Sequence, residues 1–204
     1  MCALTLPFGM RRHRIARIPA GTTRPLTMTQ SSTADPVTIR PARLSDLQAC
    51  RVIEDDAGAI FQKVGMADVD EDPPRSLDEL RQAHIHRHLW IAVDKFDTPI
   101  AFALTEDVDG NLHLAEISVV QAWQREGVGR RLIEHLVTEG RSRGYRALTL
   151  TTFRDVPWNG PYYSRLGFEE IAAGDMLPGI TSVMDSEAPQ FLESTPRIAM
   201  RRVL

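Results

Sequence analysis

A short glycine-containing segment between a predicted strand and a predicted helix is the feature that most limits how this chain can fold. Residues 124–129 read QREGVG and lie between an alternating apolar run and apolar residues at helical spacing. Gly127 and Gly129 lack a Cβ, so an anion can approach the backbone closely there. The first N–H groups of a helix have no internal partner and lie at its positive end. The turn therefore predicts a pyrophosphate site, with positive charge added by Arg125 and Arg130.

The same turn is also compatible with a tight strand-to-helix connection that binds nothing. Two other nucleotide-binding motifs are excluded in detail. The third glycine of a Rossmann fingerprint would fall at Leu132, and no early βαβ unit precedes the turn. The P-loop needs a GKS or GKT sequence, which the chain lacks.

Apolar periodicity and turn residues divide the rest of the chain into strands and helices. Ser45-Asp46-Leu47 is predicted to cap a first helix whose apolar face includes Val52 and Ile53, and Ser76 is predicted to cap a second. Further helices are expected at 127–143 and 158–166, and residues 173–195 are expected to form a long loop. The predicted strands are 37–40, 89–93, 100–108, 112–120, 146–153, 168–172 and 197–203. This order predicts an α/β fold in which a mixed central β-sheet is flanked by helices on both faces.

The amino-terminal segment differs from the rest of the chain in charge and pattern. Residues 1–34 contain five arginines and no acid, so a net charge of −3 for the whole chain leaves −8 for the remainder. The acidic remainder argues against nucleic acid as a partner. Residues 1–35 lack apolar periodicity, so we expect a disordered, dispensable extension before one domain at 36–204. A transit peptide, a basic arm or an untidy start before Met28 would each explain it.

Hydropathy and cysteine content indicate where the chain works. No apolar run approaches the roughly 20 residues that a membrane-spanning helix needs, so no membrane association is expected. Cys2 and Cys50 share no metal-ligand or redox spacing, which favours reduced thiols and a cytoplasmic protein.

Two motifs in order resemble the GNAT (Gcn5-related) N-acetyltransferase superfamily. Residues 124–129 match its Q/R-x-x-G-x-G/A signature, and NGPYYSRLGF at 159–168 is similar to its N…YxxxGF ending. The resemblance covers about residues 37–204 and implies a splayed sheet that binds acetyl-CoA as cosubstrate, without a metal. It also implies a bulge in the strand before the glycine turn, where backbone N–H groups become exposed. The implied coenzyme-binding residues are Val119, Gln124, Arg125, Glu126, Gly127, Val128, Gly129, Arg130 and Asn159. Many members place the asparagine further upstream of the tyrosine than Asn159 lies here.

The resemblance also implies catalytic roles. Tyr163 lies four residues before Gly167, where the family keeps the tyrosine that protonates the leaving thiolate; otherwise it is a packed aromatic residue. Glu116 is a candidate base, directly or through water, or else an ion-pair partner. By the two-residue strand period it shares a face with Leu114, Ser118 and Val120, whereas His113 lies on the other face. His84, His86 and His88 lie at a helix-to-strand junction without a carboxylate at ligand spacing, so no metal site is predicted.

The resemblance implies a primary amine as acceptor, and such an amine must lose a proton before it can attack the thioester. We expect a small-molecule amine; the alternatives are a protein N-terminus or lysine, and a non-catalytic module that binds acetyl-CoA. An acidic loop with Asp68, Asp70, Glu71 and Asp72 could attract a cationic amine, or could simply be solvated. A homodimer is left open.

Overall fold

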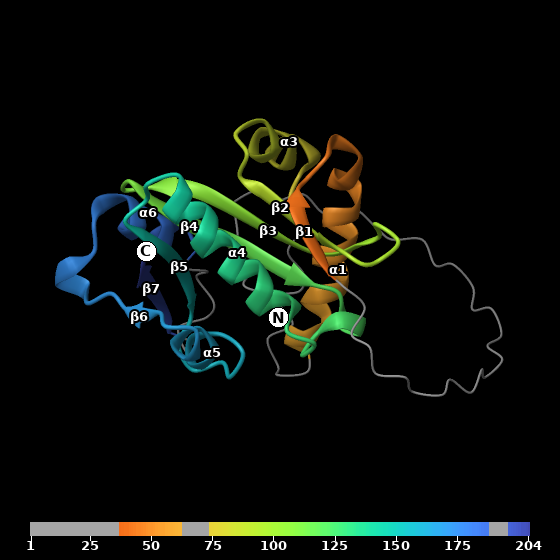
Figure 1. Cartoon of the computed structure of the whole chain (residues 1–204). Helices are drawn as coiled ribbons and strands as arrows, with labels where there is room; N and C mark the ends of the chain where they lie inside the picture. The colour runs from red at the N-terminus through yellow and green to blue at the C-terminus, as the bar shows by residue number, and fades with distance from the viewer. Residues whose placement is uncertain (1–36, 63–73, 188–195) are drawn as a thin grey trace.

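The computed structural model describes residues 37–62, 74–187 and 196–204, and Figure 1 shows its arrangement. The strands are β1 (Thr38–Pro41), β2 (Leu89–Val93), β3 (Pro99–Val108), β4 (Asn111–Val119), β5 (Ala147–Phe153), β6 (Glu169–Glu170) and β7 (Arg197–Val203). The α-helices are α1 (Leu47–Gln62), α3 (Leu77–Ile85), α4 (Val128–Ser142), α5 (Gly160–Arg165) and α6 (Pro178–Ser186). Short 3-10 turns lie at Leu44–Asp46, Gln121–Trp123 and Ala173–Asp175.

The described strands form one sheet in the order β1-β2-β3-β4-β5-β7-β6. All neighbouring strands are antiparallel except β4 and β5, which are parallel. Helix α4 connects these two strands, because parallel neighbours need a crossover connection. The predicted mixed sheet with helices on both faces is therefore confirmed.

Two apolar clusters cover opposite faces of the sheet. On one face α4 lies across the sheet (Figure 1) and buries Val128, Leu132, Ile133 and Leu136 against alternate residues of β2 to β5. On the other face α1 and α3 bury a second cluster that includes Ile53, Leu80 and Phe102. Apolar residues repeat along α4 with the period of one helix face, which is why this helix was readable from sequence.

The segment expected to be a long loop at 173–195 contains α6, so that prediction is wrong for residues 178–186. Ile180 and Met184, one helical turn apart, pack with Ile171 and Ala199 on the face of the sheet that α4 does not cover. The cap of α6 comes from a distant residue: Asp109 accepts hydrogen bonds from the N–H groups of Gly179 (2.9 Å) and Ile180 (2.8 Å). No local capping residue announces this helix, so Gly, Pro and Ser content alone misled the sequence reading.

Smaller differences occur at α1. Within the predicted cap Ser45-Asp46-Leu47, Asp46 makes the contact: its carboxylate accepts the Arg43 N–H at 2.7 Å, where the chain enters α1. Val52 is 59% exposed, so it does not belong to the apolar face that Leu47 and Ile53 form. By contrast Ser76 does cap α3, in a reciprocal capping box with Glu79.

Some of the remaining predictions concern segments that lie outside the described residues, and one concerns membrane-spanning helices. Residues 1–36 and the acidic loop with Asp68, Asp70, Glu71 and Asp72 lie outside the described residues, so the division into an extension and one domain stays a prediction. Within the described ranges, no helix combines the length and the apolar character that crossing a bilayer requires.

Candidate active site

The two parallel strands at the centre of the sheet separate towards their carboxyl ends. β4 and β5 pair only from Leu112 with Leu148 to Leu114 with Leu150. Beyond that point β4 continues to Val119 along β3, and β5 continues along β7. An opening therefore lies between the two strands, where an extended ligand can add main-chain hydrogen bonds.

A β-bulge in β4 marks the start of this opening. Leu104 of β3 pairs with Glu116 and the next residue, Thr105, pairs with Leu114, so Ala115 is the extra residue. A bulge bends its strand and leaves backbone groups outside the regular ladder. The family resemblance implied such a bulge, and the sequence itself gave no position for it.

The bulge changes which side chains of β4 share a face. Leu114 and Ile117 belong to the cluster under α4, whereas Ala115 belongs to the cluster on the α1 side. Glu116 follows Ala115 on the α1 side, so the expectation that it shares a face with Leu114 is wrong. His113, next to Leu114 but pointing the other way, then lies on the same face as Glu116. The two-residue strand period gave the wrong face for Glu116, because one inserted residue reverses the alternation of side chains between the two faces of the sheet.

The glycine turn follows β4 directly, at the mouth of the opening. Gly127 is the amino-terminal cap of α4 with a left-handed φ of 79°, and Arg125 also has a positive φ of 66°. The first hydrogen bond of α4 runs from the Arg131 N–H to the Gly127 carbonyl at 3.0 Å. The N–H groups of residues 128–130 therefore precede the helical ladder and lie at the positive end of the helix.

Two of the predicted coenzyme-binding residues support the turn from within. The amide nitrogen of Gln124 donates to the carbonyl of Val119 at 3.1 Å, which ties the turn to the end of β4. Val119 itself is 1% exposed. Arg125, Glu126 and Arg130 are exposed, so the charged side chains of the turn lie on the surface around the buried Gly129.

Helix α5 places the predicted tyrosine and asparagine beside the carboxyl end of β5. Gly160 allows this approach, because a Cβ there would lie 2.4 Å from the carbonyl oxygen of Arg154. Asn159 occupies the amino-terminal cap position of α5 without a capping hydrogen bond from its side chain, and it is 2% exposed. Tyr163 is 1% exposed in the cluster under α4. The rings of Tyr163 and Phe168 meet edge to face with centroids 5.7 Å apart.

The neighbouring Tyr162 has a different environment. It is partly buried, and burial raises the pKa of its hydroxyl to about 12, although the charge of Arg130 opposes that rise. Since Arg130 acts on Tyr162, the start of α4 lies close to α5. The glycine turn and the two tyrosines are thus brought together from positions more than thirty residues apart.

A buried ionic cluster lies on the α1 side of β4. The guanidinium Nε of Arg75 donates to Glu116 Oε2 at 2.9 Å, and the backbone N–H of Arg75 donates to Glu54 at 3.0 Å. The hydroxyl of Ser118 donates to the second oxygen of Glu116 at 2.9 Å. Glu54, Arg75 and Glu116 are 5%, 7% and 0% exposed, and we refer to these three residues as the Glu54–Arg75–Glu116 cluster.

Sequence reasoning selected Glu116 but missed Glu54 and Arg75. Burial raises the pKa of Glu54 to about 8, and the charge of Glu116 adds to the rise. Burial also raises the pKa of Glu116, against the lowering effect of Arg75. Nothing in the sequence indicated the contacts among these three residues, because Glu54 lies in the middle of a helix and Arg75 simply follows two prolines.

His113 lies fully buried on the same face of the sheet. Its Nδ1 lies 3.0 Å from the hydroxyl of Thr149, and its Nε2 has no hydrogen-bond partner among the described residues. Burial lowers the pKa of His113 to about 4, and the charges of Arg197 and Arg75 lower it further. The imidazole is therefore neutral at physiological pH.

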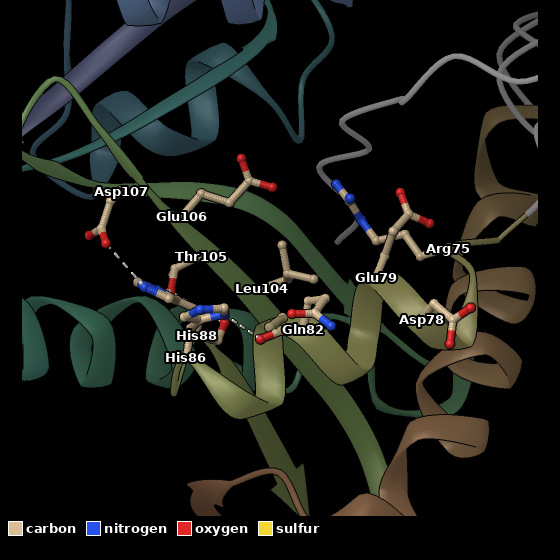
Figure 2. Close-up of a pocket in the computed structure, with 11 residues that line it drawn as sticks. Arg75, Asp78, Glu79, Gln82, His86, His88, Leu104, Thr105, Glu106 and Asp107 are labelled. Carbon is tan, nitrogen blue, oxygen red and sulfur yellow. Dashed lines mark hydrogen bonds and ion pairs between the residues drawn. The ribbon is translucent and has the colours of Figure 1, made fainter.

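A pocket of about 520 Å³ lies beside the cluster, between α3 and the carboxyl half of β3. Arg75 and Glu79 lie at one end and His86, His88 and Asp107 at the other, as Figure 2 shows. His88 Nε2 is 3.5 Å from a carboxylate oxygen of Asp107.

The three histidines near this pocket have different partners. His84 contacts the carbonyl of Ala42, His86 that of Gln82, and His88 the hydroxyl of Thr105. Among the described residues, no group of three or more His, Cys, Asp or Glu side chains is arranged so that it could hold a metal ion.

Comparison with known proteins identifies the family. The model of the acetyltransferase (GNAT) family matches residues 53–168, which span α1 to the end of the tyrosine motif. The chain belongs to the GNAT acetyltransferase family. The predicted family membership is thereby confirmed.

Individual GNAT relatives and structures agree with this membership. The chain is 36% identical over 84 residues to the [ribosomal protein bS18]-alanine N-acetyltransferase of Salmonella typhimurium, which is 41% of this chain and 57% of that protein. The chain thus spans little more than half of this GNAT enzyme's length.

The crystal structure of the Escherichia coli ribosomal-protein-S18-alanine N-acetyltransferase has a TM-score of 0.60 at 24% identity, covering 82% of this GNAT chain and 94% of that one. The PaiA N-acetyltransferase of Thermoplasma acidophilum, in complex with coenzyme A, has a TM-score of 0.60 at 11% identity, with 83% and 99% covered. At these identities the structures support the fold alone.

Proposed function

We propose that this GNAT protein is an acetyl-CoA-dependent N-acetyltransferase whose acceptor is the α-amine at the amino terminus of a protein. The observation that carries the proposal is the opening between β4 and β5 with the glycine turn at its mouth. The coenzyme fits this site: the opening offers strand edges to the pantetheine arm, and residues 125–130 offer N–H groups to its pyrophosphate. Bound acetyl-CoA supplies an activated acetyl thioester.

Acetyl transfer then requires the acceptor nitrogen to lose its proton and the thiolate to leave. Glu116, on the α1 face next to the opening, is the proposed base, directly or through water. Tyr163, on the opposite side of the opening, is the proposed acid that donates a proton to the departing sulfur. Backbone N–H groups near the bulge and Val119 are the proposed donors to the developing oxyanion. Gln124 ties the glycine turn to the end of β4, and Asn159 is proposed to contact the coenzyme.

The choice of acceptor rests on the relatives. From the sequence we expected a small-molecule amine, with a protein amine as the alternative. The Salmonella and Escherichia coli enzymes are named for acetylating an alanine of a ribosomal protein, which favours the protein alternative. A cytoplasmic location stays a prediction in line with that acceptor.

The test is a panel of amine acceptors assayed with acetyl-CoA by thiol release and mass spectrometry. The panel contains short peptides with free amino termini that begin with alanine and other residues, the same peptides with blocked amino termini and an internal lysine, and small polyamines. We expect acetylation of free peptide amino termini and none of the blocked peptides.

The panel separates the alternatives. Acetylation of polyamines but not of peptides would restore the small-molecule acceptor. Acetylation of blocked peptides would indicate lysine as the acceptor. Tight binding of acetyl-CoA in calorimetry without transfer to any amine would indicate a binding module and overturn the proposed activity.

A further inference from the structure

The Glu54–Arg75–Glu116 cluster holds two carboxylates against one arginine, Glu116 at its guanidinium and Glu54 at its backbone N–H. With both carboxylates ionised the cluster has a net charge of −1, and with one proton added it is neutral. All three residues are at most 7% exposed. Burying an uncompensated charge is costly in free energy, so the cluster favours the state that carries one proton.

The positions of the carboxylates allow them to share that proton. Both are held by the same residue, Glu116 by the Nε of Arg75 at 2.9 Å and Glu54 by its backbone N–H at 3.0 Å. Two carboxyl groups that share a site ionise in two separated steps, the second one raised. The raised pKa of Glu54, about 8, agrees with this second step.

We propose that Glu54 is a positioning residue of the reaction, which fixes Arg75 and shares one proton with Glu116 so that Glu116 becomes a stronger base for the acceptor ammonium. The proposal rests on the proposed acetyltransferase function. Its residues come from α1, the segment before α3, and β4, and they meet on the amine-facing side of the opening.

Other titratable groups surround the cluster. The charge of Asp55 on α1 raises the pKa of Glu54, and the charge of Glu106 on β3 raises that of Arg75. On the same face the buried thiol of Cys50 lies within electrostatic range of Glu116, Asp46 and Glu54, whose charges add to the effect of burial in raising its pKa. On β4 the neighbouring His113 is neutral, because burial lowers its pKa.

The proton transfer balances within the cluster. The N–H bond of the acceptor ammonium breaks, its electron pair stays on nitrogen, and the proton joins the carboxylate pair, whose net charge with Arg75 changes from −1 to 0. The free amine then attacks the thioester carbon, so that a C–N bond forms and the C–S bond breaks with its electron pair on sulfur. The attacking nitrogen loses its second proton to water, and the departing thiolate takes a proton from Tyr163, which regains one from water. Because the proton-accepting state is the fully ionised one, activity rises with pH through about 8.

The first experiment measures the shared proton without any assay of activity. The full chain is labelled with ¹³C at glutamate carboxyl carbons and titrated by NMR. We expect one carboxyl in the wild type to titrate near pH 8. In Glu54→Gln this titration should disappear, and Glu116 should titrate at lower pH. Glu169→Gln is the matched control, since Glu169 is an exposed acid on β6, and it should leave the titration near pH 8 unchanged.

The second experiment tests the role in catalysis. With an acceptor identified by the amine panel, the acidic limb of the kcat/KM profile should lie near pH 8 in the wild type. In Glu54→Gln it should move to lower pH by roughly one unit or more, with a lower kcat because Glu116 becomes a weaker base. Glu54→Asp keeps the carboxyl on a shorter side chain and should give an intermediate limb.

The outcomes are distinguishable. Retention of the pH 8 titration in Glu54→Gln would overturn the shared proton. If Glu54→Gln loses this titration but the acidic limb of its kcat/KM profile does not move, the cluster has only a structural role and the proposal fails. If Glu54→Gln does not fold, the same readings on Glu54→Asp decide, and an unchanged titration and limb there count against the proposal. Failure of every amine in the panel overturns the acetyltransferase function itself, while the NMR titration reports separately on the proton.

Discussion

The two sides of the β4–β5 opening are built in different ways. On the α4 side, the proposed coenzyme site consists of backbone N–H groups presented by one short turn and the start of one helix. On the α1 side, the proposed amine site consists of charged side chains held in the interior. Arg75 is 21 residues from Glu54 and 41 from Glu116, so three separate segments must fold before that cluster exists.

This difference explains why a sequence motif is recognisable on one side only. A six-residue turn with positive φ favours glycine at a fixed position, as at Gly127, and such a short run can be read directly from the sequence. The α1 side can be built from any charged groups that meet across the fold.

The largest expected effect is the loss of acetyl-CoA binding in Gly129→Glu. Gly129 is buried at the start of α4, where a glutamate side chain would add bulk and negative charge beside the pyrophosphate. Hydrogen bonds to a charged group are worth about 1.5–3 kcal/mol each, so losing two should weaken binding by about 10³-fold. Calorimetry measures the dissociation constant.

The matched control is Gly174→Glu. Gly174 is exposed, and a Cβ there meets no atom within 4 Å, so the same residue change occurs away from the opening. Unchanged acetyl-CoA affinity in a folded Gly129→Glu variant would mean that the turn does not bind the coenzyme.

The next effect is a fall in turnover for Tyr163→Phe. The substitution keeps the ring that packs against Phe168 and removes only the hydroxyl. General acid catalysis is worth ~10² to 10⁴-fold, and a thiolate is a fair leaving group, so kcat should fall by about 10²-fold. Acetyl-CoA affinity should change little, and the loss should shrink with a donor whose thiol is more acidic.

Tyr162→Phe provides the comparison for this effect, because Tyr162 is the adjacent, partly buried tyrosine. Its kcat should stay near that of the wild type. Equal kcat for Tyr163→Phe and the wild type, measured where chemistry limits the rate, would assign Tyr163 a purely structural role.

Most of the fold was predictable from sequence, and the parts that were not have identifiable physical causes. The strands around the Asp109–Asn111 turn and the helix at 128–142 follow from apolar periodicity and from glycines that permit positive φ. Helix α6 was missed because its cap, Asp109, is about seventy residues away. Local propensity cannot report a hydrogen bond that forms only when distant segments meet.

The candidate site likewise contains some residues that the sequence indicated and others that it did not. The turn, Tyr163 and Glu116 could be proposed from motifs, and their roles stay predictions. The face on which His113 and Glu116 lie could not, because the extra residue Ala115 is invisible in a regular strand pattern. Glu54 and Arg75 entered the site only through the structure.

A smaller effect is expected when the turn loses its conformational freedom. Gly127 has a φ of 79°, and a Cβ there would meet no atom within 4 Å, so Gly127→Ala adds backbone strain without a clash. Such strain costs about 1 kcal/mol, which lowers the melting temperature by about 2–4 °C in a protein of this size. Gly174→Ala, which has open space and no positive φ, should cause no such loss. Equal melting temperatures for both variants would contradict the strained turn.

The smallest effect is a change in the slope of stability against pH, and it concerns the α1 side. His113 has its pKa lowered from 6.5 to about 4, so the unfolded chain binds a proton between these values that the folded chain does not. Folding stability supplied by neutral His113 is therefore lost as pH falls through this window.

Glu54 acts with the opposite sign, because its pKa is raised from 4.5 to about 8 and the folded chain holds the extra proton. Its contribution is complete below pH 4.5 and is lost as pH rises through about 8. In the wild type the two trends partly cancel between pH 6.5 and 4.5.

His113→Asn keeps a hydrogen-bonding group near Thr149 but cannot titrate, so its melting temperature should fall less on acidification than that of the wild type, or even rise. His86→Asn, at an exposed histidine on the rim of the pocket, serves as control and should keep the wild-type slope. If the melting temperatures of His113→Asn and the wild type changed in parallel with pH across this window, burial would not lower the pKa of His113 in the folded protein.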